Sequence, residues 1–156
     1  MTVASLLSSK PSGAHTVLPW ASVASALRRL SGPPRIGALV VTSEHGRVLG
    51  VLSERDIVKG LSDHGAELLN TAVETVMSQN VPTCSPEDSL ALVMRTMTVS
   101  KFRYLLVVHR GDLLGVVSIG DVVSARVKET ELETAVLRDM VVGGRSLRSA
   151  MVPARH

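Results

Sequence analysis

The stretch Gly50–Asp56, GVLSERD, is followed 65 residues later by a second version of itself, Gly115–Asp121, GVVSIGD. In both copies an apolar segment ends at a serine, and an aspartate comes three residues after that serine. A serine with an acid three residues later is typical of a helix start, where both side chains bond to free backbone N–H groups. The two copies therefore predict two strand-to-helix junctions of the same kind.

The similarity extends outward from this motif in both directions. Gly46–Lys59 aligns with Gly111–Ser124, with seven of 14 positions identical. At a shift of 67, Thr16–Val41 aligns with Thr83–Val108, with eight of 26 positions identical. The two shifts differ only at a turn, where changes of length are tolerated. The chain is therefore predicted to be an internal duplication.

A helix is expected early in each repeat, because apolar residues recur there with the i, i+3, i+4, i+7 spacing of one helix face. These positions are Val23, Ala26, Leu27 and Leu30, and in the second repeat Leu90, Val93, Met94 and Met97. We expect Ser85 to cap the second of these helices, with Pro86 at its first position and Glu87 and Asp88 in its first turn.

Two strands follow each of these helices. Ala38–Val41 and Leu105–Val108 are continuous apolar runs, which indicate strands covered on both faces. Turns that contain glycine lead from them into Val48–Leu52 and Leu113–Val117, so each pair is predicted to be a hairpin.

A second helix is expected to start at Glu54 and at Ile119. The first should end near Gly60, and the second near Met140, before Gly143-Gly144. Between the repeats, Thr71–Glu74 has the spacing of a capping box and predicts a short helix to Met77.

The predicted fold is α+β, with two β-α-β-β-α repeats packed as an intramolecular pseudo-dimer. We divide the chain into repeat 1 (residues 1–62), a linker (63–77), repeat 2 (78–142) and a flexible tail (143–156).

The repeated Ser-x-x-Asp motif has two interpretations. Helix capping alone explains each copy taken singly. A nucleotide site uses the same geometry, because helix N–H groups and the serine hydroxyl can hold phosphate. The aspartate can accept hydrogen bonds from the hydroxyls of a ribose. The residues alone leave both interpretations open.

The repeated GVxSxxD string, the hairpin before it and the strands IGALVV and FRYLLVV resemble the cystathionine-β-synthase (CBS) domain family, in particular stand-alone bacterial members. The resemblance implies a non-catalytic regulatory module, involved in signal transduction, that forms homodimers. It also implies that AMP, ADP, ATP or an NAD-type ligand binds in clefts between the repeats. Two departures are His109, where aspartate is frequent, and Leu106, where proline is common.

The resemblance also implies the site residues. One cleft would combine Ser118 and Asp121 with Thr83, Tyr104 and Leu105, and the other Ser53 and Asp56 with Thr16, Gly37 and Ala38. Arg55 and Arg103 would meet phosphate. We expect the Asp121 cleft to matter more, because Arg103 and Tyr104 are assigned to it and Gly120 leaves its helix start open.

Other classes of function find little support. The five histidines lack metal-ligand spacing, and no motif of nucleophilic catalysis occurs, so neither catalytic nor metal-binding residues are expected. A net charge of +3 is too low to predict nucleic-acid binding, even with the tail arginines Arg145, Arg148 and Arg155. The main alternative is a structural protein-interaction module with empty clefts.

The expected surroundings follow from the same residues. The lone Cys84 fits a reducing compartment, and no apolar stretch approaches the length of a membrane span, so we expect a cytoplasmic protein. The expected partners are an adenine nucleotide, a second copy of the chain and an effector protein that the sequence does not identify.

Overall fold

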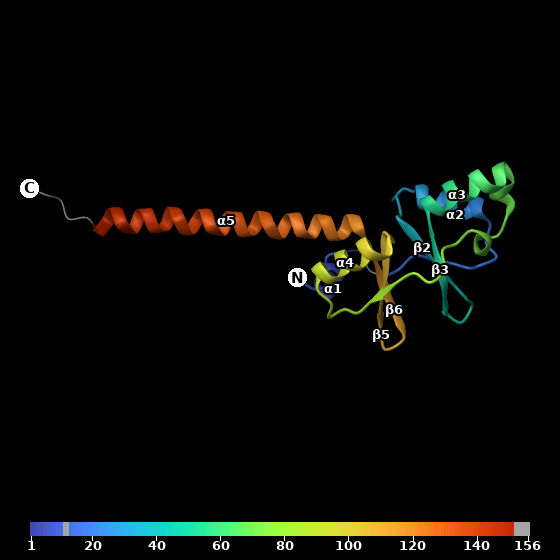
Figure 1. Ribbon diagram of the computed structural model, residues 1–156, viewed down its shortest axis with the longest axis horizontal. Coiled ribbons are helices and arrows are strands. Elements are labelled where there is room, and N and C mark those ends of the chain that lie inside the picture. The colour runs from blue at the N-terminus through green and yellow to red at the C-terminus, as the bar shows by residue number, and fades with distance from the viewer. Residues whose placement is uncertain (11–12, 152–156) are drawn as a thin grey trace, which may run out of the picture. The chain divides into compact units, whose positions relative to one another are not determined.

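The computed structural model describes residues 1–10 and 13–151, and the side chains up to residue 143. The chain divides into two compact units, Met1–Val122 and Val123–His156. Both strand-rich repeats lie in the first unit (Figure 1). The second unit continues α5, which spans Ile119–Met151.

The two repeats have the predicted order of elements. The first contains β1 (Thr16–Val17), α2 (Val23–Ser31), β2 (Ala38–Thr42), β3 (Val48–Ser53) and α3 (Glu54–His64). The second contains β4 (Thr83–Cys84), α4 (Leu90–Ser100), β5 (Tyr104–His109), β6 (Asp112–Ser118) and α5. Two short 3₁₀ helices, η1 (Gly65–Asn70) and η2 (Val73–Thr75), connect them. The α+β architecture with duplicated units is confirmed.

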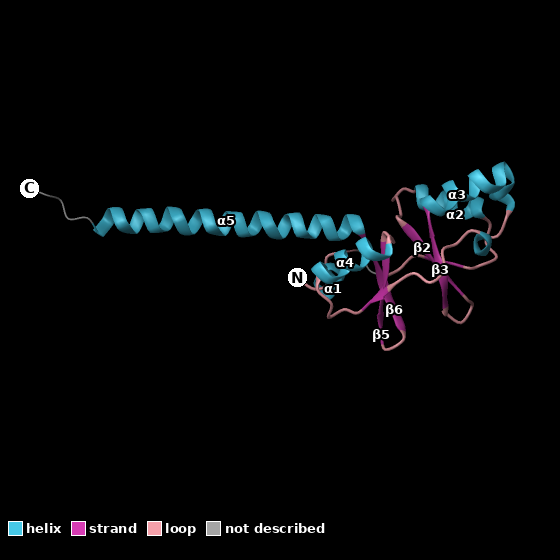
Figure 2. Cartoon of the chain, viewed as in Figure 1, coloured by secondary structure: helices cyan, strands magenta, loops and turns pink. Residues whose placement is uncertain are grey.

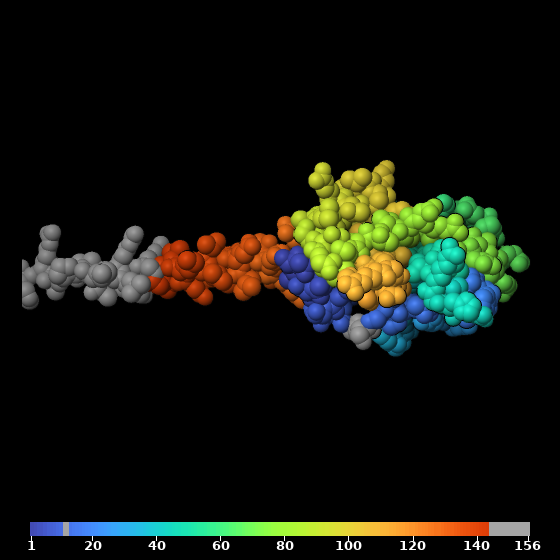
Figure 3. Space-filling view, turned by 90° about the horizontal axis from the view of Figure 1, so that it is seen from below, coloured from blue at the N-terminus to red at the C-terminus, as the bar shows by residue number. Residues whose placement is uncertain are grey.

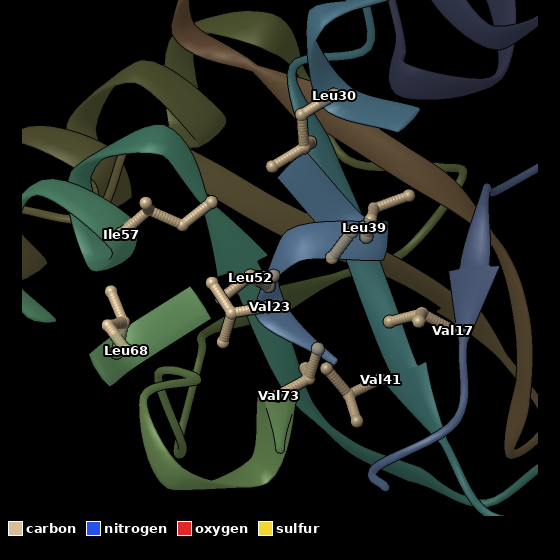
Figure 4. Packing of buried hydrophobic residues seen from close by; sticks show 10 residues of the cluster. Val17, Val23, Leu30, Leu39, Val41, Leu52, Ile57, Leu68 and Val73 are labelled. Carbon is tan, nitrogen blue, oxygen red and sulfur yellow. The ribbon is translucent and has the colours of Figure 1, made fainter. Parts of the chain in front are cut away.

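Each repeat forms a three-stranded sheet, in the order β1-β2-β3 and β4-β5-β6 (Figure 2). The first two strands of each sheet are parallel, and the last two form the predicted antiparallel hairpin. All five residues of β2 are buried, as its continuous apolar run predicts. One face of β2 packs under α2, α3 and η1, where Val23, Leu39 and Leu52 meet (Figure 4).

The other face of the first sheet packs against the second sheet. Ala38, Val40 and Val51 form one buried cluster with Leu106 of β5. The side chains of Tyr104 and Val116 extend this cluster on the side of the second repeat. The two repeats therefore bury apolar faces against each other, which is the pseudo-dimer that the duplication predicts.

A helix that the sequence did not predict lies near the start of the segment assigned to repeat 1. This helix, α1 (Val3–Ser8), packs on the second repeat, where the Val3 N–H donates to the Asp88 carbonyl at 2.9 Å. Leu7 of α1 reaches the backbone of β6 at Gly115. Figure 3 shows the N-terminal residues, in blue, beside the yellow-green surface of the second repeat. The segment expected to open repeat 1 is therefore part of the packing of repeat 2.

Two capping assignments were wrong. Ser89, and not Ser85, caps α4, because its hydroxyl accepts the Leu92 N–H at 3.1 Å. Ser85 instead starts a turn, in which its N–H donates to the Asp88 carboxylate at 2.9 Å. Thr71 forms no capping box, since its hydroxyl donates to the Leu68 carbonyl at 2.7 Å. The short helix after it is η2.

The predicted helix ends were also too early. The backbone of α3 continues past Gly60 to His64, and α5 continues through Gly143-Gly144 to Met151. Glycine lowers helix propensity by about 1 kcal/mol relative to alanine but does not forbid the helical backbone. Residues 143–151, expected to begin an irregular tail, are thus helical, and residues 152–156 lie outside the described part of the chain. Within the described ranges, no helix has an apolar segment long enough to cross a bilayer.

The single cysteine lies at the end of β4, where Cys84 is 8% exposed. Burial, assisted by the carboxylate of Asp88, raises the pKa of its thiol to about 11. Because the thiolate is the reactive form, we expect iodoacetamide at pH 8 to label folded Cys84 at least about tenfold more slowly than the urea-unfolded chain. Mass spectrometry measures both rates, and equal rates would contradict the buried position.

Candidate functional site

The two Ser-x-x-Asp motifs cap the helices that follow them. In the first, one oxygen of Asp56 accepts the Ser53 N–H at 2.8 Å and the Ser53 hydroxyl at 2.9 Å. In the second, Asp121 accepts the Ser118 N–H at 2.9 Å, and the Ser118 hydroxyl accepts the Asp121 N–H at 3.1 Å. The capping interpretation is therefore confirmed, and a binding role has to rest on what surrounds each aspartate.

Asp56 lies in a cavity of about 330 Å³, here called the Asp56 cleft. The first repeat contributes Ser53, Arg55 and Asp56 to its wall, and the second contributes Arg103 and Tyr104. The remaining lining residues are Val51, Lys59, Ser78, Val81, Lys101 and Phe102. The hydroxyl of Ser78 donates to the other carboxylate oxygen of Asp56, Oδ1, at 2.6 Å.

Asp121 lies in a second cavity of about 400 Å³, here called the Asp121 cleft. The second repeat contributes Val116, Ser118 and Asp121, and the first repeat contributes Gly37 and Ala38. Tyr104 lines this cleft as well. The remaining lining residues are Lys10, Gly13, Ala14, His15, Pro34, Arg35 and Ile36.

The predicted partners of the two aspartates were exchanged. Asp121 lies with Gly37 and Ala38, and Asp56 lies with Arg103 and Tyr104. The first residues of β2 and β5 face the opposite sheet, so each strand start meets the Ser-x-x-Asp motif of the other repeat. The reason given for ranking the Asp121 cleft first was therefore wrong, because Arg103 belongs to the Asp56 cleft.

Four predicted residues line neither cleft. Leu105 is fully buried, because it follows Tyr104 in β5 and its side chain therefore points to the opposite face of the sheet. Thr83 lines a third cavity, of about 520 Å³, between the two hairpins. Thr16 and Gly120 are exposed outside both clefts.

The sequence reasoning missed several polar groups of the clefts. Lys10 donates to the Asp121 carboxylate at 2.6 Å and to the Val116 carbonyl at 3.0 Å. Burial alone would raise the pKa of Asp121, but hydrogen bonds from Lys10 and Ser118 outweigh it and hold that pKa below its ordinary value. No repeated motif marks Lys10, and only the packing of α1 on the second repeat brings it there.

The duplication itself relates the lining residues of the two clefts. Arg103 and Tyr104 of the Asp56 cleft align with Ile36 and Gly37 of the Asp121 cleft. Val81 and Ala14 correspond in the same way. If each Ser-x-x-Asp motif had been combined with the strand start of the other repeat, the alignment would have grouped these residues correctly.

Tyr104 stands between the two clefts. Its hydroxyl donates to the Gly37 carbonyl at 2.9 Å, which joins the starts of β5 and β2. Burial, with the carboxylate of Glu54 nearby, raises the pKa of this phenol above its ordinary value. The ring thus forms part of the wall of both cavities.

Known proteins have the same kind of domain and a similar fold. The profile of the CBS domain matches residues 14–63 and again residues 73–128. A CBS-domain containing protein from Agrobacterium tumefaciens, ATU1752, has a crystal structure that superposes with a TM-score of 0.76 at 40% identity, over 80% of this chain and 92% of that one. The structure of CBSX2 in complex with AMP superposes with a TM-score of 0.66 at 25% identity, over 83% of this chain and 98% of that one.

A curated relative is the mitochondrial CBS domain-containing protein CBSX3 of Arabidopsis thaliana, 33% identical over 113 residues. The match covers 70% of this chain but only 55% of the length of that relative. The profile of one domain matches both repeats, the repeats have the same order of elements, and each cleft is lined by residues of both repeats. The chain therefore belongs to the CBS-domain family and carries a pair of CBS domains.

Proposed function

We propose that this chain is a non-catalytic regulatory module that binds an adenine nucleotide in clefts between its two repeats. The observation that carries the proposal is the composition of the clefts. Each places a helix start and a carboxylate from one repeat against the strand start of the other. Volumes of about 330 and 400 Å³ lie in the range of small-molecule sites.

The chemistry of the clefts suits a nucleoside. In the Asp121 cleft, no described group donates to the Oδ1 atom of Asp121, so this oxygen can accept a ribose hydroxyl. Ala38 and the Tyr104 ring supply apolar surface for a base. Arg55 and Arg103 in the Asp56 cleft offer charge to phosphate. The complex of AMP with CBSX2, a relative of similar fold, supports AMP as the first ligand to test.

The test measures the melting temperature with and without AMP, ADP, ATP and NAD. A ligand that binds only the folded state at a hundredfold excess over its Kd stabilises it by about 2.7 kcal/mol. We expect Asp56→Ala combined with Asp121→Ala to remove most of this increment, because both ribose acceptors are lost. Each single variant should remove the part that belongs to its own cleft.

The control separates binding from capping. Loss of a capping group alone costs about 0.5–2 kcal/mol without ligand and leaves the ligand increment intact. Asp63→Ala, an exposed site in α3 away from the clefts, should leave both quantities unchanged. An AMP increment that survives in the double variant would overturn the nucleotide sites and favour a protein-interaction module with empty clefts.

We also propose that the module is a homodimer. The first unit exposes large apolar side chains on two of its helices, namely Val58 and Leu61 on α3 and Leu92 and Val99 on α4. Val58 is 67% exposed and Val99 is 78% exposed, and a second copy would cover such surface. Light scattering at micromolar concentration should give twice the chain mass of 16.6 kDa, and a monomer mass would contradict the proposal.

A further inference from the structure

The two clefts differ in charge although the repeats supply equivalent backbone positions. Arg55, Lys59, Lys101 and Arg103 line the Asp56 cleft, against the single carboxylate of Asp56. All four cationic side chains are exposed, and none of them forms an ion pair with another described residue. Their charge is therefore available to an anion.

The cations of the Asp121 cleft are already paired. Lys10 lies 2.6 Å from the Asp121 carboxylate. Arg35 reaches Glu54 with two guanidinium nitrogens, at 2.8 and 3.1 Å from Oε1. Lys10 is thus held by Asp121, and a phosphate that drew Lys10 away would lie beside an uncompensated carboxylate. Repulsion between two such anions at short distance opposes binding.

We propose that the two clefts take different adenine ligands. The Asp56 cleft selects an adenine nucleotide, whose phosphate its unpaired cations can contact, and the Asp121 cleft selects an adenosine compound without phosphate. This inference rests on the proposed function and adds a ligand class for each cleft. Lys10 is the residue that determines specificity in the Asp121 cleft, since it neutralises Asp121 and leaves the Oδ1 atom open to the ribose.

The unpaired cations of the Asp56 cleft should affect both the affinity for ATP and its dependence on salt. Hydrogen bonds with an ionised partner are roughly twice as strong as neutral ones, so the exposed cations that contact the phosphate chain should together change affinity about tenfold or more. Screening by salt weakens such contacts at exposed groups. Binding at the Asp56 cleft should therefore weaken with salt, and binding at the Asp121 cleft should not.

Isothermal titration of the full chain with ATP and with adenosine tests the proposal. Asp56→Ala should weaken ATP binding about tenfold or more and leave adenosine binding within about twofold, and Asp121→Ala should do the reverse. Lys59→Gln with Lys101→Gln should weaken ATP by about tenfold or more at low salt, without effect on adenosine. This pair lies on the surface, so it keeps the test valid if an aspartate variant does not fold.

Lys10→Gln provides the matched test of the other cleft. It should weaken adenosine binding, because Asp121 loses the ammonium group that neutralises it and holds its carboxylate with Oδ1 open to the ribose, and it should leave ATP binding unchanged. If one aspartate variant weakens both ligands and the other weakens neither, the two ligands share a cleft, and the charge division is wrong while nucleotide binding stands. If neither ATP nor adenosine binds the wild-type chain, the division between the clefts is wrong, whereas the proposed function fails only if AMP, ADP and NAD also leave the melting temperature unchanged.

Discussion

Gly50→Ala is expected to destabilise the folded chain by about 3 kcal/mol, at the upper end of the usual cost of overpacking. A Cβ atom at this position of β3 would lie 2.6 Å from the backbone carbonyl oxygen of Ser78 and 2.9 Å from the Met77 sulfur. The carbonyl cannot move aside easily, because the Ser78 and Val51 backbones bond to each other in both directions at 2.9 Å. The melting temperature should fall by roughly 6–12 °C.

The duplication supplies the control for this substitution. Gly115 is the aligned position in β6, but there a Cβ atom would meet only the flexible end of Leu7, at 3.1 Å. Gly115→Ala should therefore cost less than about 1 kcal/mol, since Leu7 can rotate away. Urea unfolding of both variants measures the difference, and equal losses would show that the contact with Ser78 is not the cause.

Leu39→Ala is expected to cost about 2–5 kcal/mol, the range for a leucine removed from a close-packed core. Leu39 is 0% exposed and lies in β2, in one cluster with Val23 from α2 and Leu52 from β3 (Figure 4). The surrounding strands cannot collapse into the space, because both faces of β2 are covered. Chemical denaturation should show a lower midpoint with an unchanged slope.

An exposed leucine serves as the control that isolates the effect of packing. Leu132 in α5 is 66% exposed, so Leu132→Ala should change stability by less than about 0.5 kcal/mol. If the two alanine variants lose similar amounts, then Leu39 does not hold the core in the way described.

Local pattern predicted the elements of the fold well. The apolar runs at Ala38–Val41 and Leu105–Val108 lie within β2 and β5, and the two Ser-x-x-Asp motifs fix the starts of α3 and α5. These signals are strong because a buried strand and a capped helix each impose a residue pattern over a few neighbouring positions. The internal duplication doubled every such signal.

The clefts depended on information that the local pattern does not contain. Whether Tyr104 or Leu105 faces the other sheet is decided by the register of one residue along β5. Lys10 reaches Asp121 from 111 positions away in the chain. Contacts between distant segments of this kind leave no periodic trace, so the partners of each aspartate were exchanged and Lys10 was missed.

Each cleft combines residues of both repeats, and this arrangement affects how such a module can evolve. If a single CBS domain paired with an identical copy, the two-fold symmetry would make both clefts the same, and every substitution would appear in each. In one covalent chain, equivalent residues of the two repeats are encoded separately and can mutate independently. Arg103 and Ile36 occupy equivalent places, each lines only one of the two clefts, and they already differ in size and charge. A mutation here alters one cleft at a time, so one half can acquire a new ligand while the other keeps the old one.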